Sequence, residues 1–89
     1  MKRERTRLVC NLFAKLLRDT NADQPEVDLR RIEACLKAAL DQEPAPCPEG
    51  ERLFRARVLQ GIPAQLNGEE RLSVLEELLA RVSATLAPA

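Results

Sequence analysis

The chain has 89 residues, enough for one small domain, and its 14 basic residues balance its 14 acidic ones. This balance leaves no net charge to attract nucleic acid or a membrane surface. Histidine, tyrosine and tryptophan are absent. Because histidine is the most common general base and metal ligand, we expect a protein that is not an enzyme and that holds no cofactor or metal.

The cysteines and the apolar runs indicate a cytoplasmic protein. Cys10, Cys35 and Cys47 have no paired spacing, so we expect reduced thiols. Cys47, in a proline-rich connector, is expected to be the most exposed of the three. We find neither a signal-peptide pattern nor an apolar run long enough to span a bilayer. The bias toward Arg, Ala, Leu and Pro suggests a bacterial source.

The first predicted helix spans about residues 5–19. Its apolar residues repeat at the i, i+4 spacing of an amphipathic helix and form two adjacent stripes: Leu8, Val9, Leu12, Phe13, Leu16 and Leu17. Four cations at the amino terminus resemble a basic arm: Lys2, Arg3, Arg5 and Arg7. A turn is expected at residues 20–23.

The second predicted helix spans about residues 24–42, after an N-cap at Asp23. One face carries the apolar residues Leu29, Ile32, Leu36, Ala39 and Leu40. Glu33 and Lys37 have the spacing of a favourable i, i+4 ion pair. Pro44 is expected to end this helix, because the residue before a proline is driven out of the α region.

A proline-rich connector at residues 43–48 leads to a third predicted helix at about residues 49–60. Leu53, Phe54 and Val58 share its apolar face, and Arg57 projects into the same arc. Two interpretations of Arg57 stay open: its methylenes cover the edge of the core, or its guanidinium receives a carboxylate from a partner helix. Gly61 is expected to end the helix in the left-handed conformation, with Ile62 packing back.

The fourth predicted helix spans about residues 68–86, with Asn67 as its N-cap and Glu70 three residues later. Five apolar residues with a 3-4-3-4 spacing form what we call the seam: Leu72, Leu75, Leu79, Val82 and Leu86. The seam is longer than the third helix. Its cover must therefore include the first helix, a second copy of the chain or another protein.

Residues 1–89 are thus expected to form a single all-α domain in which four helices pair as two helical hairpins, a small bundle that forms a homodimer. The predicted function is that of a non-enzymatic cytoplasmic adaptor, regulator or chaperone-like protein. We expect it to bind a protein partner through the seam, while three arginines set the polar register: Arg52, Arg55 and Arg57.

Two alternative functions stay open. The basic amino terminus allows a nucleic-acid-associated transcriptional regulator, although the charge balance makes nucleic acid the weaker candidate. The second alternative is an anti-sigma-factor-like regulator, since Val27–Leu40 resembles the carboxy-terminal region of flagellar anti-sigma factors. The glycine turn of that region is absent here, and Arg55–Leu79 matches the same scheme comparably, so no family is assigned. Small secretion-system chaperones are similar in size and helicity.

Overall fold

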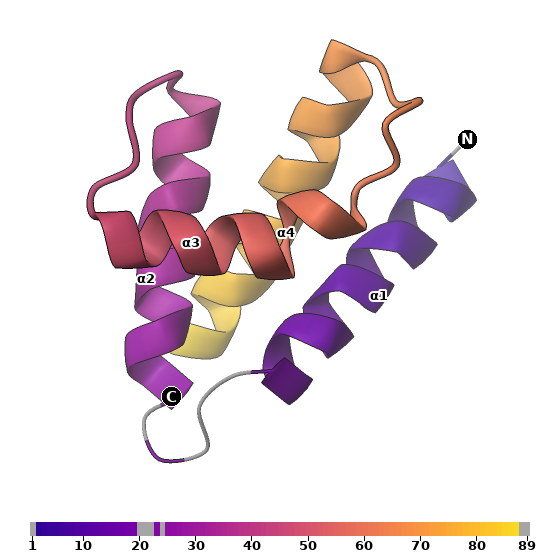
Figure 1. The fold of residues 1–89 in the computed structure, drawn as a ribbon. Helices are drawn as coiled ribbons and strands as arrows, with labels where there is room; N and C mark the ends of the chain where they lie inside the picture. Colours follow the sequence, from indigo (N-terminus) through magenta and orange to yellow (C-terminus); the bar gives the residue numbers. More distant parts are fainter. Residues whose placement is uncertain (1, 20–22, 24, 88–89) are drawn as a thin grey trace.

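The computed structural model describes residues 2–19, 23 and 25–87, without the side chains of Lys2, Arg3 and Asp19. This part of the chain contains helices and no strand (Figure 1), which confirms the all-α class. The elements in chain order are α1 (Lys2–Asp19), α2 (Pro25–Leu40), α3 (Pro48–Arg57), the 3₁₀ turn η1 (Leu59–Gly61) and α4 (Gly68–Leu86). None of the described helices is both long enough and apolar enough to cross a bilayer.

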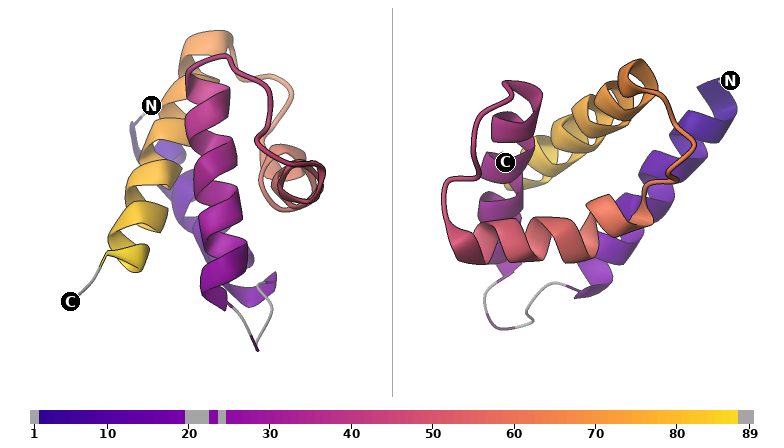
Figure 2. Two further views of the ribbon diagram at one scale, coloured as in Figure 1. Left: turned by 90° about the vertical axis from the view of Figure 1, so that its left-hand side faces the viewer. Right: turned by 45° about the horizontal axis from the view of Figure 1, so that its top comes forward.

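The helices pack in a different order from their order in the chain. Extensive contacts join α2 to both α3 and α4, and α1 to α4. Figure 1 shows α3 running across the other helices rather than beside α4, and the left view of Figure 2 looks nearly along its axis. The pairing of α1 with α2, and of α3 with α4, as two hairpins is therefore not seen in the described residues.

A single core lies between the helices. Every helix contributes to it, and almost all of the side chains are aliphatic: Val9, Leu12, Leu16, Leu29, Ile32, Cys35, Leu36, Phe54, Val58, Ile62, Val74, Leu75, Leu78 and Val82. The apolar faces predicted for the first three helices supply most of these residues. Leu17 is an exception, because its side chain is 43% exposed.

The amino terminus is helical from Lys2 onward, three residues earlier than expected. The four cations of the predicted basic arm therefore lie on the first turn and a half of α1. The side chains of Lys2 and Arg3 lie outside the described part of the chain. Of the turn expected at residues 20–23, only Asp23 is described, and residue 24 after this expected cap lies outside the described part as well.

Helix α2 ends at Leu40 in a Schellman motif, four residues before Pro44. Gln42 has a φ of 58°, which is the left-handed conformation. The Glu43 N–H donates to the Ala38 carbonyl over 2.8 Å, and the Gln42 N–H donates to the Ala39 carbonyl over 3.2 Å. A backbone motif, and not Pro44, therefore ends the helix.

Helix α3 is shorter than predicted and is continued by η1. The prediction that Gly61 is left-handed is wrong, because no described glycine has a positive φ. The reason for a glycine here is steric: a Cβ at Gly61 would lie 2.5 Å from Leu12 Cδ2 on α1. The glycine lets the end of η1 approach α1 closely, and Ile62 packs into the core as expected, with 7% of its surface exposed.

The start of α4 agrees with the prediction. Asn67 is the N-cap, and its Oδ1 accepts a hydrogen bond from the Glu70 N–H over 2.8 Å. This cap fixes where the connector from η1 turns into the helix.

Candidate functional site: an apolar cavity with an acidic rim

The seam of α4 faces mostly inward. Leu75 and Val82 belong to the core, with 6% and 0% of their surfaces exposed. Leu79 and Leu86 are half-buried and pack against the core, whereas Leu72 is 40% exposed. The core residues Leu75 and Val82 can contact a partner only if the helices separate.

Two core residues of α4 lie outside the predicted seam, Val74 and Leu78. Together with Val82 they form an i, i+4 stripe that is readable in the sequence. This stripe was missed because α4 packs against both α1 and α2, so its buried arc is wider than a single seam.

Arg57 forms an ion pair with a carboxylate of its own chain. Its Nη1 donates to Asp28 Oδ2 over 3.2 Å, and the two side chains are only 19% and 13% exposed. The guanidinium thus receives a carboxylate, as one interpretation held, but from α2 of the same chain and not from a partner helix. The missed residue is Asp28, and the available signal was an acidic residue one turn before Ile32 on the apolar face of α2.

Arg52 and Arg55 lie on the surface of α3. Arg55 Nη2 forms an ion pair with Glu51 Oε1 at 2.6 Å, one helical turn earlier. Both arginines line a shallow hollow of about 290 Å³ together with Pro48 and Glu51. The three arginines do not gather at one place, because Arg57 is engaged with α2.

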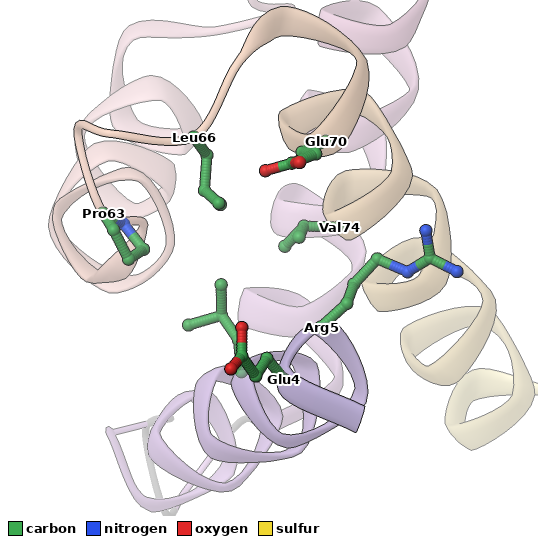
Figure 3. Close-up of a pocket in the computed structure, with 7 residues that line it drawn as sticks. Glu4, Arg5, Pro63, Leu66, Glu70 and Val74 are labelled. Atoms are coloured by element: carbon green, nitrogen blue, oxygen red, sulfur yellow. The ribbon is translucent and has the colours of Figure 1, made fainter. Parts of the chain in front are cut away.

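A cavity of about 440 Å³ lies between α1, the connector after η1 and the start of α4 (Figure 3). Its lining is mostly apolar and includes three charged residues, Glu4, Arg5 and Glu70. The full lining comprises Glu4, Arg5 and Leu8 from α1, Pro63 and Leu66 from the connector, and Glu70 and Val74 from α4. In Figure 3 the side chains of Leu66 and Val74 point into the open space.

Local sequence features hold the connector in position beside α1. The close approach of Gly61 to Leu12 brings the end of η1 against α1. A turn follows, in which the Leu66 N–H donates to the Pro63 carbonyl over 3.3 Å. The Asn67 cap then starts α4. Leu66 is thus placed between two fixed points, opposite α1.

The charges around the cavity leave a negative rim. Arg5 Nε lies 2.9 Å from Glu77 Oε1 on α4, in an ion pair that lacks hydrogen-bond geometry. Its guanidinium extends toward α4 and away from the cavity (Figure 3). Glu4 and Glu70 are exposed and form no ion pair with any residue that the structure describes. We call these two carboxylates the acidic rim.

Polar contacts elsewhere join the helices. Ser83 Oγ on α4 donates to Glu33 Oε2 on α2 over 2.7 Å. Glu33 also lies 4.0 Å from Lys37 Nζ, which confirms the predicted i, i+4 pair. In the described part of the chain, no cluster of three or more Cys, Asp or Glu side chains is arranged to hold a metal ion.

No protein-family model, curated protein or solved structure matches this chain.

Proposed function

We propose that this protein is a non-enzymatic interaction module that binds another protein through the apolar cavity and its acidic rim. The observation that carries the proposal is an apolar lining bordered by two carboxylates that have no cationic partner among the side chains that the structure describes. Such a site suits an amphipathic partner helix that inserts apolar side chains and carries Lys or Arg beside them.

The dimensions of the cavity support this partner. Its volume of about 440 Å³ falls within the range of about 300–1,000 Å³ that is common for binding pockets. The cavity lies between two helices, where a partner's apolar residues at i and i+4 can enter while its backbone stays outside. Leu8, Leu66 and Val74 supply the apolar contacts.

The charge of the rim favours a protein over a nucleic acid at this site. Phosphate groups are repelled by the carboxylates of Glu4 and Glu70, whereas Lys and Arg are attracted. A nucleic acid would have to bind elsewhere, and steep weakening of binding by salt would reveal it.

Two further parts of the proposal rest on the sequence, a regulatory or adaptor role in the bacterial cytoplasm and assembly as a homodimer. The exposed portion of the seam, together with Arg52 and Arg55, is the partner surface expected from the sequence, and the experiment below tests it against the cavity. Leu72 is the seam residue with the most accessible side chain. Because the chain is proposed to form a homodimer, a second copy is the main competing occupant of the cavity.

The proposal is tested by selecting helical peptides from a displayed library on the immobilised protein. We expect enriched peptides to share apolar residues at i and i+4 with an adjacent Lys or Arg. Their affinity is then measured by fluorescence anisotropy against matched variants. Glu70→Lys should weaken binding about tenfold by reversing a rim charge, whereas Glu69→Lys should not.

Glu69 is a close control because both residues are exposed acids in the first turn of α4. Both substitutions therefore lose the same favourable interaction with the helix dipole. A second pair of variants tests whether the peptide binds in the cavity or at the seam. Leu66→Ala should weaken binding and Leu72→Ala should not. The proposal is wrong if no peptide family is enriched, if both members of each pair bind alike, or if labelled DNA binds instead with steep salt dependence.

A further inference from the structure

Two cysteines that are far from a paired spacing in the sequence meet at the junction of α2 and α3. A Cβ placed on Gly50 would lie 3.1 Å from Cys47 Sγ and 3.2 Å from Cys35 Sγ. Both sulfur atoms thus border the same small space, which exists because residue 50 has no side chain. Cys35 comes from the buried face of α2, and Cys47 is the N-cap of α3.

The two thiols differ in access. Cys35 has only 2% of its surface exposed. Burial raises the pKa of the Cys35 thiol, and the neighbouring Cys47 and Glu51 raise it further. Cys47 is half-buried, and its Sγ accepts a hydrogen bond from the Gly50 N–H over 3.2 Å. A reagent from solution therefore reaches Cys47 before Cys35.

The expectation that Cys47 is the most exposed cysteine is wrong, because that residue is Cys10 on α1. Cys10 takes no part in the pair that meets at Gly50. It can therefore be replaced without altering the pair.

We propose that Cys35 and Cys47 are a site of oxidation by hydroperoxides, at which an intramolecular disulfide forms between α2 and the start of α3. The inference does not rest on the proposed function, since the cavity between α1 and α4 shares no residue with this pair.

The reaction has two steps. The Cys47 thiolate attacks one oxygen of the hydroperoxide and becomes a sulfenic acid, while the other oxygen leaves as an alcohol, or as water when the oxidant is hydrogen peroxide. The Cys35 sulfur then attacks the sulfenic sulfur, the S–S bond forms and water leaves. The pair loses two electrons and two protons, and the peroxide is reduced.

Gly50 leaves the space that the two sulfur atoms need in order to approach each other. A disulfide requires an S–S distance of about 2 Å, so the two side chains must rotate toward each other in the shared space. An alanine Cβ would crowd both sulfur atoms, at 3.1 and 3.2 Å. The disulfide would also remove the thiol that caps α3 and join residues 35 and 47 covalently, so oxidation would change how α3 is held against α2.

The test uses the full chain with Cys10→Ser, so that only the proposed pair remains. The folded protein is treated with hydrogen peroxide, remaining thiols are alkylated, and the intact mass and tryptic peptides are recorded without reduction. We expect a loss of two hydrogen atoms and a linked product of peptides 32–37 and 38–52. Reduction before digestion should separate the two peptides.

Three variants make the test specific. With Cys35→Ala, Cys47 should gain oxygen atoms instead of losing hydrogen, because no resolving thiol is present. With Cys47→Ala, Cys35 should stay reduced because it is buried. Gly50→Ala, confirmed as folded by circular dichroism, should slow disulfide formation about tenfold, because the rate of exchange depends on the access of one sulfur to the other.

Oxidation of Cys47 alone in the protein that retains Cys35 would overturn the inference. The absence of any oxidation, or disulfides formed only between chains, would do so equally. The measurement on the folded Cys10→Ser protein decides the matter even if a core variant fails to fold.

Discussion

At the scale of single residues, two positions depart from local preference, and each has an identifiable cause. Gln42 adopts a left-handed conformation because the Schellman motif that ends α2 requires it. Asp28 is a carboxylate with only 9% of its surface exposed, and Arg57 provides its countercharge. The left-handed Gln42 and the Arg57 partner of Asp28 show only in the structure, although an acidic residue on the apolar face of α2 is visible in the sequence.

Replacing Gln42 by glycine should stabilise the protein. A side chain with a φ of 58° costs about 1 kcal/mol that glycine does not incur. We expect Gln42→Gly to raise the free energy of unfolding by about 0.5–1 kcal/mol in urea denaturation. Asp41→Gly, at the preceding exposed residue without a positive φ, should give no gain. Equal effects of the two substitutions would show that the left-handed conformation is not maintained.

The Arg57–Asp28 pair should make a larger contribution than the Arg55–Glu51 pair. Removing one partner leaves a charge in a mostly buried place, so Asp28→Ala should cost about 1–3 kcal/mol. A double-mutant cycle should give a coupling above 1 kcal/mol, measured by urea denaturation. The pair on the surface of α3 should give about 0.5 kcal/mol or less. Similar couplings for both pairs would contradict the buried position of Asp28.

At the scale of elements, the helices could be predicted but their neighbours could not. Apolar periodicity located each helix and most of its buried face, as Leu29, Ile32 and Leu36 on α2 show. Periodicity gives the direction of an apolar face and not the element that covers it. Predicting which helices pair, and whether Leu75 and Val82 face the core or a partner, requires knowing which element covers each face.

The connector after α3 illustrates the same limit. The sequence predicted an inward Ile62, which is observed. It predicted a helix up to Gly61, whereas α3 ends at Arg57 and only the 3₁₀ turn η1 reaches Gly61. It predicted a left-handed glycine where the constraint is contact with Leu12. A steric contact between residues so far apart in the chain has no signature in a single sequence.

Alanine substitutions at Gly61 and Gly68 should test whether the contact with Leu12 explains the glycine at position 61. Gly61→Ala would place a methyl group 2.5 Å from Leu12 Cδ2, so we expect a loss of about 1–3 kcal/mol from overpacking. A Cβ at Gly68, the first residue of α4, would have no atom within 4 Å. Gly68→Ala should therefore be neutral or stabilising by up to about 1 kcal/mol. Thermal and urea denaturation of both variants measure the difference.

At the scale of the whole molecule, the cavity results from the packing of three separated segments. Residues of α1, the connector and the first turns of α4 meet there. The sequence predicted a binding module whose amphipathic surface is the seam, and it did not indicate the cavity. It missed the cavity because Glu4, Leu66 and Glu70 are unremarkable residues until the fold brings them together.

The most direct test of the central proposal is to map the binding surface by NMR. Amide and methyl spectra of the labelled protein are recorded while a selected peptide is added. We predict that the largest chemical-shift changes occur at Leu66, Glu70 and Val74, around the cavity. Changes centred on the exposed end of the seam, or on Arg52 and Arg55, with the cavity unaffected, would contradict the proposal.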